Sequence, residues 1–202
     1  GEQNVFYGYV RPSVEINTAA LYNRAVIGLD IYPISFFGIT AGTTFRHNGL
    51  SHSSEASFED VEDTGFLSSY FANASLKFAY ADYVLFSSIK GEFFSQKDNT
   101  YDYFYEENYV LRGQKDKDTM HDFKIFIGYN KKSVGMTGFL LEGASMEGTQ
   151  SSTSNQLVVW KLPVEGKTSY VVGAGRHHSD FYENRFQLIF SINHGFAQGV
   201  VL

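Results

Sequence analysis

The sequence predicts an all-β fold, and three observations support this. Segments in which apolar and polar residues alternate follow one another along the whole chain. The apolar side of each segment carries almost no charge, while the other side combines charged residues with Gly, Ser and Thr. Short and long connections alternate between the segments. A period of two is typical of a strand with two unlike faces, and an uncharged face suits lipid. Together these features predict a single antiparallel transmembrane β-barrel.

The segment 24–32 gives the clearest alternation. Ile27 and Leu29 lie on one side of the predicted strand, and Arg24 and Asp30 lie on the other. The same rhythm resumes over 37–46 after a tight turn.

Counting such segments gives about ten strands in one domain that covers residues 1–202. Spanning strands of ~9 to 11 residues and an even strand number are typical of bacterial barrels. A further hairpin over 103–112, above the membrane, is also compatible with the sequence. Pro12 is unusual within a strand, because proline donates no ladder hydrogen bond. The predicted strands are 6–17, 24–32, 37–46, 66–78, 83–96, 122–130, 135–145, 156–162, 170–175 and 185–196.

The connections separate into two sets. Short ones are expected at 33–35, 79–82, 130–133 and 163–168. Longer polar ones are expected at 18–23, 48–65, 97–121, 146–155 and 178–184. Short turns on one side and long loops on the other are typical of outer-membrane barrels.

In this pattern, nearly the whole chain resembles the broad class of Gram-negative outer-membrane β-barrel proteins. The resemblance implies a location in the bacterial outer membrane, contact with its lipid and lipopolysaccharide, and a monomer. The net charge of -6 argues against nucleic-acid binding, and the lack of cysteine excludes thiol chemistry and disulfides. We expect no cofactor and no metal site.

A soluble lipocalin-like barrel that binds a ligand is the alternative fold. Its strands also alternate, but their apolar side faces inward. The scarcity of charge on the apolar sides and the two sets of connections favour the membrane barrel.

The polar sides of the strands predict a charged lumen. A barrel of about ten strands is narrow, so these charges either pair into a plug or line a narrow conduit. The sequence therefore favours a non-enzymatic channel or a structural or surface-interaction barrel. The predicted lumenal residues are Arg11, Glu15, Arg24, Asp30, Lys77, Lys90, Glu92, Lys124, Glu142, Lys161 and Arg185.

A His-x-Ser sequence offers an enzymatic alternative. His177, Ser179 and Asp180 resemble the His-x-Ser-Asn element of outer-membrane phospholipase A and the His-x-Ser of lipid A deacylase. The resemblance implies His177 as base and Ser179 as nucleophile, with Glu183 or Glu142 orienting the imidazole. Asp180 replaces the Asn of the phospholipase element, and alternation places His177 on the lumenal side rather than towards lipid.

Two loops complete the set of candidates. The acidic residues at 55–63 are either a solvated loop or a site for divalent cations. The aromatic loop forms a recognition surface, an interface belt or an inward-folded lid. Its aromatic residues are Tyr101, Tyr103, Phe104, Tyr105 and Tyr109.

Overall fold

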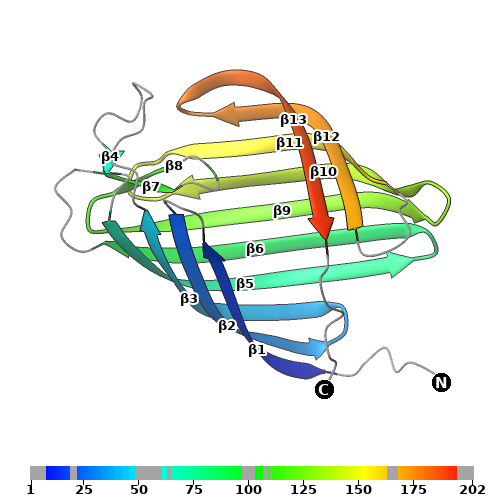
Figure 1. Cartoon of the computed structure of the whole chain (residues 1–202), viewed down its shortest axis with the longest axis horizontal. Coiled ribbons are helices and arrows are strands. Elements are labelled where there is room, and N and C mark those ends of the chain that lie inside the picture. The colour runs from blue at the N-terminus through cyan, green and yellow to red at the C-terminus, as the bar shows by residue number, and fades with distance from the viewer. Residues whose placement is uncertain are drawn as a thin grey trace.

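The computed structural model describes residues 8–18, 22–48, 61–62, 65–96, 103–106, 109, 111–162 and 168–194. Its main element is a ten-stranded antiparallel sheet in which neighbours along the chain are neighbours in space (Figure 1). The all-β fold, the strand number and the meander order are therefore confirmed. The strands are β1 (Tyr9–Thr18), β2 (Tyr22–Ile34), β3 (Phe37–Asn48), β5 (Gly65–Tyr80), β6 (Tyr83–Gln96), β9 (Lys117–Lys131), β10 (Gly135–Met146), β11 (Ser152–Lys161), β12 (Thr168–Ser179) and β13 (Tyr182–His194).

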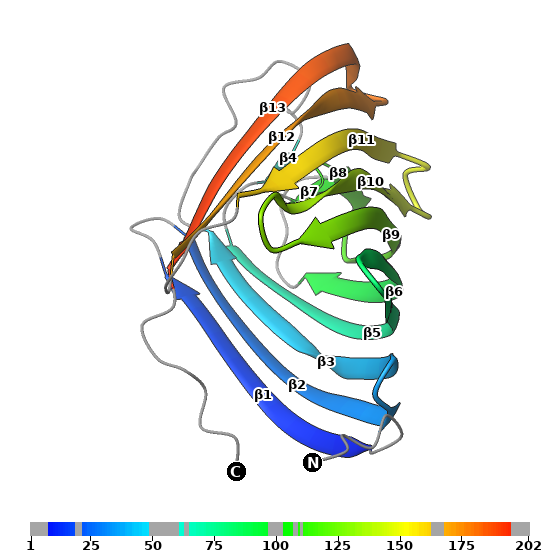
Figure 2. The ribbon, with the colours of Figure 1, turned by 90° about the vertical axis from the view of Figure 1, so that its right-hand side faces the viewer.

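The sheet curves strongly, so that it has a concave and a convex face (Figure 2). Its pairing runs from β1 to β13, and no ladder joins these two strands among the described residues. The ten-stranded meander is observed, while closure into a barrel stays a prediction. Pro12 lies within β1, opposite Leu29 of β2.

Several strands are longer than the sequence predicts. β9 begins at Lys117 and β11 begins at Ser152, where the sequence predicts long loops. The connection between β12 and β13 is a two-residue turn at 180–181. The polar ends of these strands lack apolar alternation, so only their pairing with neighbours reveals them.

The turn after β2 also differs from the prediction. The turn residues are Ser35 and Phe36, whereas Pro33 and Ile34 belong to β2. The register shifts between Ile31 and Ile34. A bulge of this kind accommodates Pro33, which has no N–H to donate.

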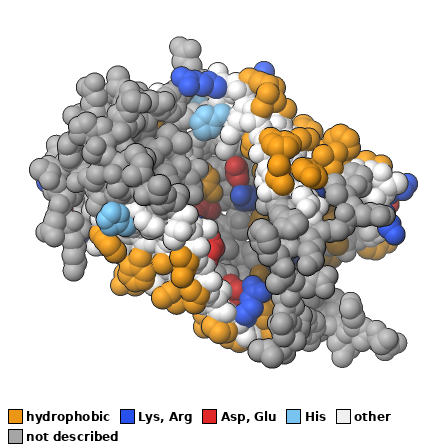
Figure 3. All heavy atoms as spheres, viewed as in Figure 1, with side chains coloured by type: hydrophobic (Ala, Val, Ile, Leu, Met, Phe, Trp, Pro, Cys, Tyr) orange, Lys and Arg blue, Asp and Glu red, His pale blue; other side chains and the backbone are white. Residues whose placement is uncertain are grey.

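Many large apolar side chains of the ten-stranded sheet lie on its convex face and are exposed. Ile27 is 51% exposed and Leu188 is 74% exposed. Other members are Val10, Val14, Ile16, Leu29, Ile39, Tyr70, Phe78, Ile89, Phe123, Ile125, Ile127, Phe139, Val158, Phe190 and Ile192. Figure 3 shows such surfaces on either side of a hollow in which charged side chains are visible.

A small second sheet lies at the end of the main sheet that carries the long connections. Its order is β4 (Val61–Glu62), β7 (Tyr103–Glu106) and β8 (Leu111–Gln114), with β4 parallel and β8 antiparallel to β7. β7 and β8 form the hairpin predicted over 103–112.

Phe104 and Leu111 of this hairpin pack in a buried cluster against the concave face of the main sheet. The other members are Leu67, Phe94, Met120, Ala144 and Met146. Gly113 is required here, because a Cβ at this position would collide with the ring of Phe104. None of the described residues forms a helix long and apolar enough to span a membrane.

Candidate functional site

A belt of polar side chains follows the concave face from β6 to β13. Its members occupy directly paired positions on neighbouring strands. The pairs are Lys90 with Asp122, Lys124 with Glu142, Glu142 with Asn155, Asn155 with His177, and His177 with Arg185. Side chains at paired positions of an antiparallel ladder interact directly. The belt therefore places charges of both signs beside one another within the concavity.

A buried group of charged side chains next to this belt holds the hairpin in place. Arg46 of β3 is 4% exposed, and Glu92 of β6 and Glu106 of β7 are 1% and 0% exposed. Arg46 Nη1 lies 3.2 Å from Glu106 Oε1, and Arg46 Nη2 lies 3.7 Å from Glu92 Oε1. One guanidinium therefore joins the wall of the sheet to the inserted segment. Buried charges are tolerated only when they are paired in this way.

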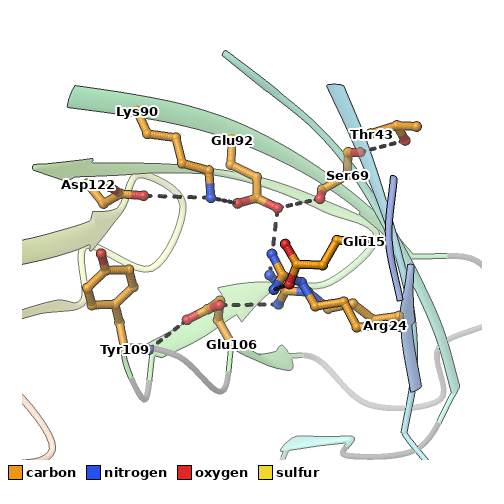
Figure 4. A network of polar contacts seen from close by, with 10 residues as sticks. Glu15, Arg24, Thr43, Ser69, Lys90, Glu92, Glu106, Tyr109 and Asp122 are labelled. Atoms are coloured by element: carbon orange, nitrogen blue, oxygen red, sulfur yellow. Dashed lines mark hydrogen bonds and ion pairs between the residues drawn. The ribbon is translucent and has the colours of Figure 1, made fainter. Parts of the chain in front are cut away.

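Glu92 is also bound from the other side. The Ser69 hydroxyl donates to Glu92, and the Lys90 ammonium pairs with Glu92 and, at 3.8 Å, with Asp122 (Figure 4). In this view Ser69, Lys90 and Glu92 point toward one another. The network thus connects β3, β5, β6 and β9 around one buried carboxylate.

Tyr109 follows β7 and anchors the turn of the hairpin. Its backbone N–H donates to Glu106 Oε2 at 2.9 Å, and its side chain packs against the buried cluster. Burial, together with the nearby carboxylates Asp122, Glu142 and Glu106, raises the pKa of the Tyr109 phenol. Burial in the hairpin therefore favours the neutral form of the phenol.

A second chain of polar contacts runs along the belt from β9 to β12. Lys124 Nζ lies 2.9 Å from Glu142 Oε2. Asn155 Nδ2 donates to Glu142 Oε1 at 3.1 Å, and Asn155 Oδ1 lies 2.6 Å from His177 Nδ1. Because an amide oxygen can only accept, His177 Nδ1 carries the proton, and Nε2 is the nitrogen with a lone pair in the neutral ring.

The His-x-Ser residues do not assemble into a catalytic pair here. His177 and Ser179 lie on the same face, but within the described ranges no hydrogen bond joins them. Ser179 is 3% exposed, and its hydroxyl accepts from the N–H of Phe181 at 3.2 Å. Asp180 instead accepts from the N–H and hydroxyl of Ser152, at 2.6 and 2.8 Å. Glu142 reaches His177 only through Asn155, and the side chain of Glu183 lies outside the described residues.

The predicted lumenal residues at the other side of the sheet form local pairs. Arg11 Nη2 lies 2.8 Å from Asp30 Oδ2, and the Thr40 hydroxyl donates to Asp30 Oδ1 at 2.9 Å. Arg24 Nη1 lies 3.6 Å from Glu15 Oε1.

Three predicted cations lie apart from these ion pairs. Lys77 lies over the rings of Tyr32 and Phe86, at 5.7 and 5.9 Å from their centroids. Lys161 is exposed near the end of β11, and Arg185 is exposed beside His177 in the register.

Five residues of the network are missing from the predicted lumenal set: Arg46, Ser69, Glu106, Asp122 and Asn155. Ser69 falls on the polar side of the segment 66–78. Arg46 and Asp122 fall on the polar sides of the segments 37–46 and 122–130, so the alternation could have predicted that they face the lumen. Glu106 and Asn155 lie where the sequence predicts loops, and nothing in the pattern marks them.

The aromatic loop is brought inward where the structure describes it. Phe104 is 1% exposed, Tyr109 packs on the buried cluster, and Arg112 lies over the Tyr103 ring at 4.8 Å. Tyr101, the side chain of Tyr105 and all but residues 61–62 of the acidic loop lie outside the described residues.

Within the described ranges, no group of three His, Asp or Glu side chains could hold a metal ion. No protein-family model, curated protein or solved structure matches this chain.

Proposed function

We propose that this chain is an integral β-barrel protein of the bacterial outer membrane, with a charged interior closed by the β7–β8 hairpin. The interior is a narrow, ion-paired conduit, and solute flow through it is small. The observation that carries the proposal is the exposed apolar surface on the convex face of nine of the ten strands, all but β12, opposite a concave face lined by charge.

Water would destabilise such a molecule. Monomeric soluble proteins rarely expose contiguous apolar patches above a few hundred Å². Here Val14, Ile27, Ile125, Phe139 and Leu188 are exposed on strands distributed across the whole sheet. A hydrocarbon environment covers this surface and leaves every polar group of the concave face inside. A lipocalin-like barrel needs the reverse arrangement, which weighs against the soluble alternative.

Strand parity supports closure. In a meander of ten strands, the first and the last run in opposite directions. β1 and β13 can therefore pair antiparallel, as every other neighbouring pair in the sheet does. Closure removes two free edges, whose backbone groups find no hydrogen-bond partners in lipid.

The hairpin supports a closed interior. Phe104 and Leu111 fill the concavity at the end with the long connections, and Arg46 holds Glu106 there through a buried ion pair. A barrel of this size has little space beyond its own side chains. An enzymatic role gains no comparable support, because Ser179 is buried and has no hydrogen bond to His177.

The test is insertion into lipid vesicles, with substitutions on opposite faces of one strand. Ile125 is exposed on the convex face, and its neighbour Lys124 pairs with Glu142 on the concave face. Charge on a lipid-facing side chain near the membrane centre costs about 2–4 kcal/mol. Ile125→Arg should therefore prevent insertion, while Lys124→Arg should insert like the wild type.

A second pair of variants replaces a serine by glutamate on each face of the neighbouring strand β6. Ser87 is paired with Ile125, and Ser88 with Lys124. Ser87→Glu should impair insertion, whereas Ser88→Glu places a carboxylate opposite a lysine and should be tolerated. Equal insertion of all four variants, or a wild type that stays soluble in detergent-free buffer, contradicts the membrane assignment.

A further inference from the structure

The convex face is not apolar everywhere, and on β11 and β12 it becomes polar near one end of the sheet. On β3, β5 and β6, exposed apolar side chains reach the end of the sheet that carries the long connections, at Phe45, Phe66 and Phe93. On β11 the exposed apolar residues stop at Val158, and Ser154 and Gln156 follow towards that end.

On β12, Arg176 and His178 lie in register with these two polar residues, Arg176 beside Gln156 and His178 beside Ser154. We call the outward residues Ser154, Gln156, Arg176, His178, Asn184 and His121 the rim patch.

Two adjoining hollows give the rim patch depth. The first has a volume of about 310 Å³, and its lining includes the apolar Ile89 and Phe123, the polar His121, Ser154 and His178, and the acidic Asp122. The second, of about 250 Å³, is lined by Ser154, Gln156, Arg176, His178 and Asn184. Since Ser154 and His178 line both hollows, an apolar depression continues directly into a polar one.

Two glycines lie on strands beside residues that line the first hollow. Gly91 is paired with His121, and Gly143 is paired with Phe123 and Ser154. A Cβ at Gly91 would find its nearest neighbour, His121 Nδ1, at 3.8 Å, so the space above it is open.

The charge of the rim patch is positive and directed outward. Arg176 is exposed, and no carboxylate within the described part of the chain forms an ion pair with it. His178 Nδ1 lies 2.8 Å from Asn184 Oδ1, which fixes the ring and turns Nε2 away from Asn184. His121 Nε2 is already bound to Glu147 at 2.9 Å, so Arg176 and His178 are the groups open to a ligand.

These features fit one ligand chemistry. A guanidinium presents a fork of donors that matches a phosphate group, and the Gln156 amide and the Ser154 hydroxyl add further donors. The apolar floor at Ile89 and Phe123, with Phe186 beside Arg176 in the register, requires a ligand that carries hydrocarbon next to its anionic group. A free phosphate ion makes no use of that floor.

We propose that the rim patch binds the phosphate group of a phosphorylated membrane lipid, whose acyl chains lie along the apolar surface of β9 to β13. The proposal rests on the membrane barrel described above. It locates the lipid contact at one side of the barrel rather than around its whole circumference.

The experiment measures lipid binding by native mass spectrometry of the refolded chain released from dodecyl maltoside micelles. The probes are diphosphoryl lipid A, the same lipid without phosphate, and inorganic phosphate as a competitor. The test variant is Arg176→Gln/His178→Gln. The matched control is Lys132→Gln, which removes an exposed cation at the turn between β9 and β10. Circular dichroism verifies that each variant is folded.

We expect the test variant to bind diphosphoryl lipid A about tenfold more weakly, the loss typical of one or two charged hydrogen bonds. The wild type should bind the lipid without phosphate more weakly by a similar factor. Lys132→Gln should bind diphosphoryl lipid A like the wild type. Equal binding by all variants in micelles overturns the lipid site alone. If inorganic phosphate displaces diphosphoryl lipid A at a concentration similar to that of the lipid, the rim patch binds a free anion and the lipid site is overturned. A wild type that is soluble without detergent overturns the barrel and the lipid site together.

Discussion

Arg46 and Glu106 are separated by 60 residues in the chain, and their side chains meet at 3.2 Å in the interior. The pair fixes the β7–β8 hairpin against the wall of the sheet. Arg46 also lies 5.4 Å from the centroid of the Phe94 ring, so it is held by the apolar cluster as well as by charge. The hairpin position therefore depends on one guanidinium more than on any single carboxylate.

We predict that Arg46→Met destabilises the protein by about 3–5 kcal/mol, because it leaves the buried Glu92 and Glu106 without this partner. Glu106→Gln should cost less, about 1–3 kcal/mol, since Glu92 keeps Arg46 and Lys90. Urea unfolding in micelles, followed by the fluorescence of the only tryptophan, Trp160, measures both free energies. As a control, Lys161→Met removes an exposed cation and should stay within about 0.5 kcal/mol of the wild type. Equal losses for Arg46→Met and Glu106→Gln would contradict the central role of Arg46.

The closed interior predicts small conductance in planar lipid bilayers. Arg46→Gln/Glu106→Gln removes the ion pair that holds the hairpin, so this variant should show larger and more frequent current steps than the wild type. Lys132→Gln, at the opposite end of the sheet, should not change the current. Large stable steps of the kind formed by open porins in the wild type would refute closure by the hairpin.

The buried phenol of Tyr109 predicts a pH dependence of stability. Its pKa is raised in the folded state, so the neutral form is favoured there. The stability that this provides is complete below the pKa of an unfolded tyrosine, about 10, and falls as the pH rises further. Tyr109→Phe should therefore lose less stability than the wild type between pH 9 and pH 11. Identical pH profiles would indicate that the phenol is exposed to solvent.

The separation of His177 from Ser179 predicts no lipid hydrolysis. We expect no release of fatty acid when the refolded protein is incubated with phospholipid or lipopolysaccharide, with or without calcium. A general base must reach within ~2.6–3.2 Å of the hydroxyl, and no hydrogen bond between the two side chains occurs in the described residues. Release that disappears in both Ser179→Ala and His177→Ala would establish the enzyme and refute this expectation.

The sequence by itself determined the strands and their faces. Alternation at Ile27 and Leu29 is a local property, because successive side chains of a strand point to opposite sides whatever the strand pairs with. The polar sides therefore identified Lys90, Lys124 and Glu142 without any knowledge of their partners.

Only the tertiary structure decided which charges meet and where the long connection goes. The contact of Lys124 with Glu142 depends on the register between β9 and β10, and a shift of one residue would turn one of them to the other face. Glu106 lies in a segment without alternation, and its place is set by the burial of Phe104 and Leu111 and by Arg46. The polar ends of β9 and β11 are strands because their neighbours offer backbone partners there. Pairing and burial are properties of the folded chain, and local periodicity does not contain them.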